Sequence, residues 1–494
     1  MELYTIDHGY RYELENICRL FFPFEKINVS DRFESESAFD VYTSVKAEQG
    51  GSRFAVSVRR GGFFAEREGF VPDDAHENGS GDELERMLAV ALYEIMCSLT
   101  DMRPQWGILT GVRPGKLMRR TVDALGADGA RRYFKEKLLC SDKKIDLCMT
   151  ASANEEKIIA SSEPNDFSLY LSVPFCPTRC SYCSFVSHSV EKSMKLVDEY
   201  VGLLCRELEY TGALAKKLGI DLKTVYIGGG TPTTLSAEQL EQVMGAVSAS
   251  FDLSKAEEYT VEAGRPDTVT REKLLAIKRG GATRISINPQ TMNDSVLEVI
   301  GRRHTAAQTE AAFALARECG FDNINMDLIA GLPTDTVESF ADTLRRIRAL
   351  DPESVTVHTL SLKRSSRLTV TGDLPEAQAG RTADEMLTLA SSGLAQSGYI
   401  PYYLYRQSRT VGNLENTGYA KPEKECLYNI FIMDETHSIL ACGASAVTKL
   451  RAPDGYIERV FNFKYPYEYI SRFDEMLRRK EAIEKFYNEH MPRR

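Results

Sequence analysis

The fold of this 494-residue chain is decided by one stretch, Tyr170-Leu-Ser-Val-Pro-Phe-Cys176-Pro-Thr-Arg-Cys180-Ser-Tyr-Cys183-Ser-Phe185. Three thiols spaced Cys-x3-Cys-x2-Cys on one short loop can bind three irons of a cubane iron–sulfur cluster and leave the fourth iron without a protein ligand. Thiolates are soft ligands, which favours an iron–sulfur centre over a hard cation. The alternatives are three buried cysteines or a zinc knuckle completed by His188, although a structural zinc site normally closes four positions.

The other eight of the eleven cysteines are scattered along the chain. Eleven cysteines are too few for a disulfide scaffold in a chain of this length. Isolated cysteines in a reducing compartment are mostly small buried hydrophobic residues. We therefore expect burial, without disulfides, for Cys18, Cys97, Cys140, Cys148, Cys205, Cys319, Cys426 and Cys442.

Strands and helices alternate from Asp166 onward, so the cysteine run follows the first strand. Strands are predicted over 167–173, 224–227, 259–262, 284–287, 324–328 and 355–361, and helices over about 193–218, 236–250, 270–280, 293–300, 306–319 and 336–349. Crossovers of this length imply a parallel sheet with the helices outside. Six such units predict the α/β class and an incomplete barrel, whose chemistry lies at the C-terminal ends of the strands.

The chain on either side of the barrel has a different pattern. Residues 1–150 predict an N-terminal α+β domain with strands over 39–46, 53–60 and 63–66, joined at Gly50-Gly51 and Gly61-Gly62, and a helix over 83–99. The basic, turn-rich stretch 106–116 is interpreted as this domain's contact with the barrel. Polar residues 151–165 predict a linker, 164–380 the barrel, and 381–494 a smaller C-terminal α+β domain. In that domain we predict helices at about 382–397 and 466–479 and a strand pair near 427–441.

Composition excludes several classes of function. The net charge of −10 argues against general nucleic-acid binding, which needs a basic face to neutralise phosphates. No run of 18 apolar residues predicts a membrane span, and the start of the chain has no apolar signal segment. Hydrophobic residues at 43% and charged residues at 27% are ordinary for a globular protein, and we predict a cytoplasmic one.

The cysteine run resembles the cluster loop of radical S-adenosylmethionine (SAM) enzymes. More narrowly, it resembles the oxygen-independent coproporphyrinogen dehydrogenase family, and the whole chain is most similar to the HemZ-type branch, which has an extra N-terminal domain. The resemblance implies a radical SAM partial (β/α)6 barrel with a [4Fe–4S] cluster at Cys176, Cys180 and Cys183. It also implies that SAM chelates the unique iron and that one electron cleaves SAM to methionine and a 5′-deoxyadenosyl radical.

Further strand ends carry the resemblance. Gly228-Gly-Gly-Thr-Pro232 follows the second strand, where glycines let the backbone approach a ligand closely. Asp327 stands in an otherwise apolar strand, where a carboxylate is costly to bury without a partner. The resemblance implies SAM contacts at Tyr170, Tyr182, Gly229, Gly230, Thr231, Glu262, Gln290, Arg302, Asp327 and Ser361. It assigns no catalytic residue of the chain itself.

The chain departs from the family pattern at three places. Ser172 stands where well-studied members have His, and Phe185 where they have a fourth nearby cysteine. Asn288-Pro289 precedes Gln290 in place of Gly-Val, and a proline there changes the backbone and removes a donor. These departures bear on the substrate, on whether a second SAM binds, and on the local geometry at Gln290.

The resemblance implies oxidative decarboxylation of coproporphyrinogen III to protoporphyrinogen IX in haem biosynthesis, with an electron donor such as flavodoxin or ferredoxin. Four propionates on this tetrapyrrole would need basic residues near the barrel mouth, for which Arg179, Lys363, Arg364, Arg367, Arg406 and Arg409 are candidates. Tyr402, Tyr403, Tyr405 and Tyr419 could wall a macrocycle site, although aromatic runs are more often core. The alternatives are a haem chaperone of the HemW type, another radical SAM reaction on a tetrapyrrole, and a zinc-stabilised binding protein.

Overall fold

The computed structural model describes residues 1–491 apart from 34–36, 74–82, 184–187, 362–375 and 408. Its internal contacts divide the chain into two units. The first contains Met1–Met149 together with Leu374–Arg381 and Arg406–Leu414, and the second contains Thr150–Asp373, Thr382–Tyr405 and Glu415–Arg494. Residues from the last quarter of the sequence therefore belong to both units.

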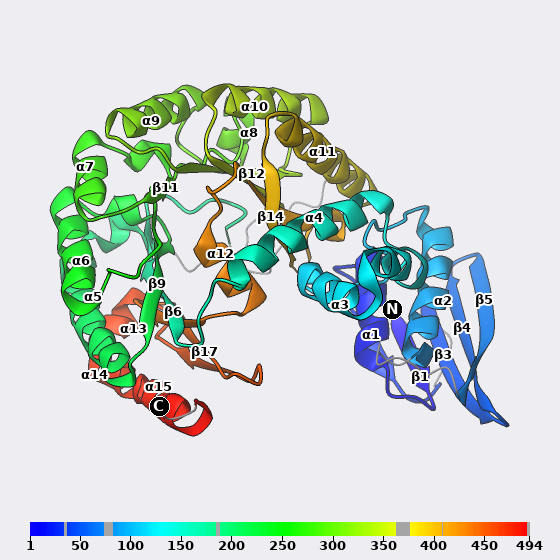
Figure 1. Ribbon diagram of the computed structural model, residues 1–494. Coiled ribbons are helices and arrows are strands. Elements are labelled where there is room, and N and C mark those ends of the chain that lie inside the picture. Colours follow the sequence, from blue (N-terminus) through cyan, green and yellow to red (C-terminus); the bar gives the residue numbers. More distant parts are fainter. Residues whose placement is uncertain (34–36, 74–82, 184–187, 362–375, 408, 492–494) are drawn as a thin grey trace. The chain divides into compact units, whose positions relative to one another are not determined.

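Six parallel strands form the centre of the second unit, and helices cover their outer side (Figure 1). The strands are neighbours in the order β6 (Asp166–Val173), β9 (Asp221–Gly229), β10 (Glu258–Glu262), β11 (Arg284–Ser286), β12 (Ile324–Ala330) and β13 (Ser354–Thr359). The helices are α5 (Val190–Leu218), α6 (Ala237–Ser250), α7 (Arg271–Arg279), α8 (Asp294–Val299), α9 (Ala306–Glu318) and α10 (Val337–Leu350). The predicted α/β class, the six strands and the six helices are confirmed.

Helix starts in the barrel are fixed by local capping. The Ser236 hydroxyl accepts from the Gln239 amide at 3.2 Å, and the Gln239 side chain accepts in return from the Ser236 amide at 2.9 Å. Thr305 and Gln308 form the same reciprocal pair at the start of α9. Such capping boxes satisfy amides that have no partner inside the helix. The signal is local, which explains why the sequence placed these helices to within a few residues.

Later segments extend the barrel sheet at both edges. Strands β15 (Glu415–Ala420) and β14 (Ile400–Arg406) follow β13, with β15 antiparallel to it. At the other edge β16 (Ser438–Cys442) pairs in parallel with β6, and β17 (Val447–Arg451) and β18 (Ile457–Phe461) follow it in antiparallel order. The remaining helices are α11 (Glu376–Gln396), α12 (Leu427–Asp434), α13 (Pro466–Ser471), α14 (Phe473–Arg479) and α15 (Glu481–His490). The predicted strand pair near 427–441 is wrong in its first half, because 427–434 is helical.

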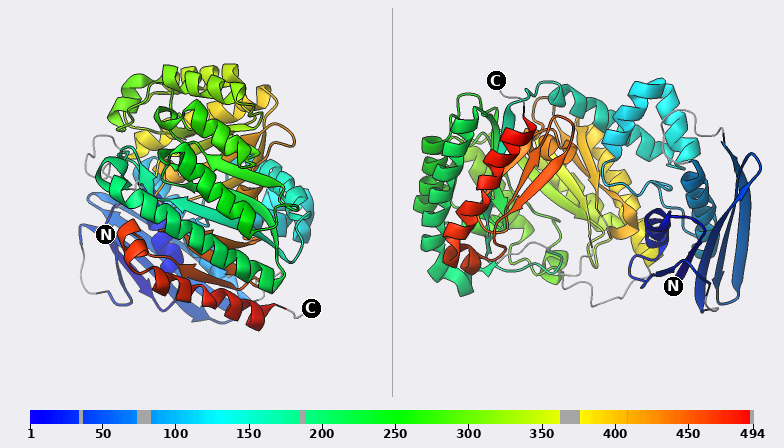
Figure 2. Two further views of the ribbon diagram at one scale, coloured as in Figure 1. Left: turned by 90° about the vertical axis from the view of Figure 1, so that its left-hand side faces the viewer. Right: turned by 90° about the horizontal axis from the view of Figure 1, so that it is seen from below.

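The C-terminal helices lie beside α5, as the red and green-cyan ribbons show in Figure 2. A fully buried ion pair joins them, with Lys480 Nζ 2.9 Å from Glu207 Oε1. The same carboxylate accepts from Tyr469 Oη at 2.6 Å, Asn462 Nδ2 at 2.7 Å and the Gly443 amide at 2.7 Å. Each buried charge is therefore paired and hydrogen-bonded, as a low-dielectric interior requires.

The first unit contains a five-stranded sheet in the order β2 (Asn28–Ser30), β1 (Glu2–Ile6), β3 (Phe39–Glu48), β4 (Gly51–Arg60) and β5 (Phe63–Pro72). The predicted hairpins join β3 to β4 and β4 to β5. Helices α1 (Arg11–Phe21) and α2 (Glu83–Thr100) pack on one another, and α2 packs on the sheet. Helix α3 (Pro114–Arg132) and a π-helical turn at Tyr133–Lys137 follow.

The predicted linker at 151–165 is wrong over most of its length, because α4 (Asp142–Ile159) continues through it. Buried positions in this helix recur at three- and four-residue spacing, at Lys144, Ile145, Cys148, Ala151, Ser152 and Glu155. Polar residues among these positions hide the apolar stripe by which a helix is recognised. The boundary between the two units falls within α4.

No helix in the described part of the chain has both the length and the apolar character needed to cross a membrane.

Candidate functional site

The three clustered cysteines lie on the loop after β6. Cys176 and Cys180 are buried and Cys183 is partly exposed, and none of the eleven cysteines forms a disulfide. Within the described residues, no three side chains of His, Cys, Asp or Glu are gathered as ligands of a metal ion. The three thiols nevertheless share one loop and are of the residue type that binds iron–sulfur clusters. Their assignment as cluster ligands stays a prediction.

The glycine-rich turn after β9 lies against the cysteine loop. The Gly230 amide donates to Val173 O at 2.7 Å, and the Thr231 amide donates to Phe175 O at 2.8 Å. A Cβ at Gly230 would lie 2.5 Å from Phe175 O and 3.0 Å from Cys176 Sγ, so a side chain does not fit there. Gly229 has φ +106°, which disfavours other residues. The glycines therefore bring the backbone close to the cysteine loop, and the predicted approach to a ligand stays a prediction.

Arg302 joins the cysteine loop to the segment after β11. Its Nη2 donates to Tyr182 Oη at 2.9 Å, and its Nη1 donates to the Asn288 carbonyl at 3.0 Å. The loop is held to the same turn by its backbone, because the Ser181 amide donates to Ile300 O at 3.0 Å. Two predicted site residues, Tyr182 and Arg302, are therefore in direct contact.

Two carboxylates lie on the inner side of the sheet, in strands β10 and β12, which are separated by β11. Glu262 ends β10 and accepts from Tyr226 Oη at 2.6 Å. Burial raises the pKa of Glu262 to about 7; the hydrogen bond from Tyr226 works against this rise, and the charge of Asp327 adds to it.

Asp327 has a different environment. Its Oδ1 accepts from Asn325 Nδ2 at 2.7 Å, and its Oδ2 lies 3.8 Å from His358 Nε2. Burial alone would raise the pKa of Asp327, but the contacts with His358 and Asn325 and the charge of Arg284 outweigh it and lower the pKa. Asp327 can therefore accept hydrogen bonds as a carboxylate at neutral pH.

Tyr170 stacks with two other tyrosines beside Glu262. Its ring centroid is 6.2 Å from that of Tyr226 and 6.1 Å from that of Tyr428, and the latter two are 4.5 Å apart. Tyr428 belongs to α12, so this helix contributes to the inner side of the barrel. Tyr170 and Tyr226 are partly exposed positions in otherwise largely buried strands, as Glu262 and Asp327 are.

Gln290 keeps a strand-like position despite Pro289. Its amide donates to Asp327 O at 2.9 Å, and its carbonyl accepts from the Ile329 amide at 2.9 Å. The residue has φ +69° and is buried. The chain at Gln290 therefore stays paired with β12 although a proline precedes it. Ser361 follows β13 at the border of the described residues, partly exposed.

The predicted substrate contacts form two groups, one basic and one aromatic. Arg406 is buried in the first unit, where its guanidinium donates to the carbonyls of Leu109 and Asn413 and lies 5.6 Å from the Trp106 ring centroid. Its guanidinium is therefore engaged by contacts within the first unit, to which Arg409 also belongs. Lys363, Arg364 and Arg367 lie outside the described residues. Tyr402, Tyr403 and Tyr419 are buried core residues.

Sequence reasoning missed several residues that hold the predicted ones. Tyr226 lies in β9, two positions before Gly228. Because β9 pairs with β10, the Tyr226 hydroxyl reaches the Glu262 carboxylate. His358 lies in β13 beside Asp327. The signal for both was a polar side chain inside a buried strand, which indicates a partner on the same face.

The residues present fit a cluster with SAM beside it. Three thiols on one loop, a glycine turn that touches that loop, and two carboxylates on the same side of the sheet supply soft ligands for iron and polar partners for an amino acid and a ribose. Of the predicted residues, Cys176 and Thr231 come shortly after β6 and β9, Glu262 ends β10 and Gln290 follows β11. Asp327 lies at the middle of β12, and Arg302 follows α8.

Comparison with known proteins agrees with this arrangement. The radical SAM superfamily pattern matches residues 170–347. The chain is 34% identical to the oxygen-independent coproporphyrinogen-III oxidase-like protein HemZ of Bacillus subtilis, over 97% of each chain. It is 30% identical to the heme chaperone HemW of Escherichia coli, over 66% of this chain and 82% of that one. Among solved structures, coproporphyrinogen III oxidase (HemN) from Escherichia coli matches with a TM-score of 0.52 and 25% identity, over 65% of this chain and 72% of that one.

Proposed function

The chain belongs to the radical SAM superfamily, in the group that contains HemN, HemZ and HemW, and on this premise we propose that it decarboxylates coproporphyrinogen III to protoporphyrinogen IX without oxygen. The observation that carries the proposal is the similarity to HemZ along 97% of both chains, which includes the first unit. Members of the superfamily use a [4Fe–4S] cluster and SAM. We propose a tetrapyrrole as substrate and a low-potential protein as electron donor.

We propose that Cys176, Cys180 and Cys183 hold the cluster and that the glycine turn holds the aminoacyl end of SAM. When bound, the two groups supply one-electron chemistry that removes a hydrogen atom from the β-carbon of a propionate, and loss of CO2 and one electron then leaves a vinyl group. The chain binds, orients and excludes water, since such chemistry belongs to the cofactors. The Gly230 amide already donates to the Val173 carbonyl, so it is not the donor to a ligand. We propose that Gly230 instead lets the backbone approach the ligand closely, because it has no side chain.

The carboxylates would recognise the polar groups of SAM. Asp327 is held in its ionised form by His358 and Asn325 and can accept from hydroxyl or ammonium groups. Glu262 is oriented by Tyr226, which leaves its second oxygen for a ligand. Arg302 fixes Tyr182 of the cysteine loop and so keeps the loop at the strand ends. We propose these residues as SAM contacts or their supports, together with Tyr170, Thr231, Gln290 and Ser361.

The testing experiment is an anaerobic incubation of the reconstituted protein with SAM, a chemical reductant and coproporphyrinogen III. Mass spectrometry quantifies 5′-deoxyadenosine and decarboxylated tetrapyrrole together. Joint formation of both, dependent on the tetrapyrrole, supports the proposal. Asp327→Asn is expected to reduce both products, whereas Asp322→Asn, an exposed position shortly before the same strand, is expected to leave both unchanged.

The second candidate is a haem chaperone, favoured by the similarity to HemW over 82% of that protein. The burial of Arg406 in the first unit also removes one of the cations expected to bind propionates. Tight haem binding, measured by absorbance titration, without conversion of coproporphyrinogen III would select this function and contradict the oxidase proposal.

A further inference from the structure

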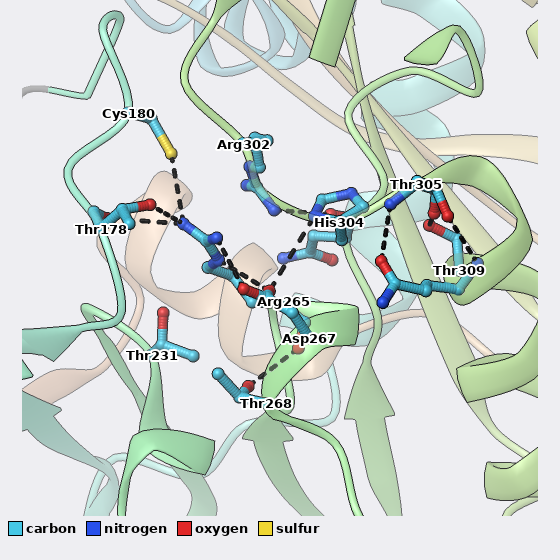
Figure 3. Close-up of polar contacts among 12 residues, drawn as sticks. Thr178, Cys180, Thr231, Arg265, Asp267, Thr268, Arg302, His304, Thr305 and Thr309 are labelled. Carbon is cyan, nitrogen blue, oxygen red and sulfur yellow. Dashed lines mark hydrogen bonds and ion pairs between the residues drawn. The ribbon is translucent and has the colours of Figure 1, made fainter. Parts of the chain in front are cut away.

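Arg265 is a buried cation beside the cysteine loop that the proposed function does not use. It follows Glu262 by three residues and is 3% exposed. A buried guanidinium needs partners for its five N–H groups, because leaving them unpaired costs free energy. The partners show what this side chain is placed to do (Figure 3).

Asp267 takes one edge of the guanidinium. Nε of Arg265 donates to Oδ1 at 3.0 Å, and Nη2 donates to Oδ2 at 2.8 Å. This bidentate pair fixes the plane of the group, which a single contact would not do. It leaves Nη1 as the nitrogen that faces the cysteine loop.

Nη1 contacts the loop at three atoms. It donates to Thr178 Oγ1 at 2.8 Å and to Thr178 O at 3.5 Å, and it lies 3.9 Å from Cys180 Sγ. Figure 3 shows the loop and Asp267 on opposite sides of the guanidinium. The positive group is therefore between its counter-charge and the sulfur, and it is closer to the sulfur than the carboxylate is.

An N–H group aimed at a cluster sulfur has a known physical effect. Hydrogen bonds to cluster sulfurs, and the charge around them, help to set the reduction potential of an iron–sulfur cluster. Reduction adds negative charge, and a cation in a buried site stabilises that charge more than it would in water. Thr178 keeps the sulfur near the cation, because its hydroxyl is held by the same nitrogen.

We propose that Arg265, braced by Asp267, donates a hydrogen bond to Cys180 Sγ and raises the reduction potential of the cluster that this cysteine ligates. Arg265 is a positioning residue, since it acts through Cys180 and the loop. The inference rests on the proposed function in one respect, namely that Cys180 is a cluster ligand.

The experiment compares reconstituted wild-type protein with Arg265→Gln, Arg265→Lys and Arg271→Gln. The cluster is titrated potentiometrically, and electron paramagnetic resonance measures the reduced cluster at each potential. Arg271 is an exposed arginine six residues further on, so it is the matched control. At a fixed potential we expect Arg265→Gln to lower the ratio of reduced to oxidised cluster about tenfold, which corresponds to about 59 mV for one electron. Arg265→Lys keeps the positive charge but loses the two-point contact of the guanidinium, so its reduction potential should lie between those of the wild type and Arg265→Gln. The reduction potential of Arg271→Gln should match that of the wild type.

The outcomes separate the inference from the proposed function. An unchanged potential in Arg265→Gln with full iron content overturns the inference. If Arg265→Gln loses its cluster, Arg265→Lys decides, and an unshifted potential there overturns it. A wild-type protein without a [4Fe–4S] cluster overturns the proposed function and the inference with it. A wild-type cluster that leaves coproporphyrinogen III unchanged overturns the proposed reaction alone, while the potentials still decide on Arg265.

Discussion

Glu262 and Asp327 are both partly exposed carboxylates on the inner side of the barrel, but their neighbours move their pKa values in opposite directions. Burial raises the pKa of Glu262 to about 7, and the hydrogen bond from Tyr226 offsets only part of this. At Asp327 the contacts with His358 and Asn325 outweigh burial and lower the pKa. At neutral pH the site therefore holds one full negative charge and one carboxyl group that is close to its titration point.

The state of Glu262 predicts a pH dependence of SAM binding. Below pH about 7 Glu262 of the free protein takes up a proton, so a ligand that needs the carboxylate must displace it. We expect the Kd for SAM to rise as the pH falls below about 7, by at most about tenfold per pH unit. Isothermal titration calorimetry between pH 6 and 8 measures this, and Glu262→Gln should flatten the profile. A profile in Glu262→Gln as steep as that of the wild type would contradict the assignment.

Replacing the three clustered cysteines should cause a loss of cluster and activity that replacing an isolated cysteine should not cause. Replacing Cys176, Cys180 or Cys183 by alanine removes a ligand from a three-thiolate set, so we expect loss of the cluster and of all SAM cleavage. Iron analysis and the yield of 5′-deoxyadenosine measure both effects. Cys319→Ala is the control, since that cysteine lies alone after α9. A triple cysteine variant that still forms 5′-deoxyadenosine would refute the ligand assignment.

For single residues, the sequence predicts which side chains lie at strand ends but not which other side chains contact them. Asp327 could be found because it interrupts an apolar strand, and Glu262 could be found through the family resemblance, as the residue that ends its strand. The partners of Tyr226 and Arg265 could not be predicted, because these contacts depend on the register of β9 against β10 and on where the cysteine loop passes.

Helix α12 shows how an element depends on a distant residue. Its sequence Leu-Tyr-Asn-Ile-Phe-Ile-Met-Asp is apolar and predicts a strand. The Glu258 carboxylate accepts from the Leu427 amide at 2.7 Å and from the Tyr428 amide at 3.3 Å, so it caps the helix from another strand. A short apolar run gives no periodicity that separates helix from strand, and a cap from 169 residues away leaves no local signal.

Removing this cap is expected to destabilise the protein. Glu258→Gln replaces a buried carboxylate acceptor by a neutral amide, and we expect the free energy of unfolding to fall by about 1–3 kcal/mol. Urea unfolding followed by circular dichroism measures it. The adjacent Glu257→Gln is the control, because that residue is exposed and its pair with Lys223 should be worth less than about 1 kcal/mol. Equal effects of the two variants would show that the cap is unimportant.

Across the whole second unit, the C-terminal segment is part of the barrel rather than an appendage. Strand β16 lies beside β6, and the helices after it lie on α5. The buried pair between Glu207 and Lys480 joins these parts. The sequence predicted the barrel strands because each was followed by its helix, but it could not predict this closure, since it joins segments far apart in the chain.

The two lysines that join α5 to the C-terminal helices should differ in their contributions to stability. Lys480→Met leaves the Glu207 charge buried without its partner, and we expect a loss of about 3–5 kcal/mol in the free energy of unfolding. Lys217→Met breaks an exposed pair with Glu484 and should cost less than about 1 kcal/mol. Guanidinium chloride unfolding compares them. A small loss in Lys480→Met would show that the buried pair does not hold the segment in place.

The pairing of β16 with β6 also has a consequence for synthesis on the ribosome. Ser438 of β16 pairs opposite Phe167 of β6. About 270 residues must therefore be translated after β6 before β16 can cover that edge of the strand, which takes on the order of 15–50 s. Until then the strand that leads into the cysteine loop has an open edge in the nascent chain. We therefore expect the iron–sulfur centre to be loaded only after the C-terminal strands have emerged, so that oxygen reaching the nascent chain meets thiols and no exposed cluster.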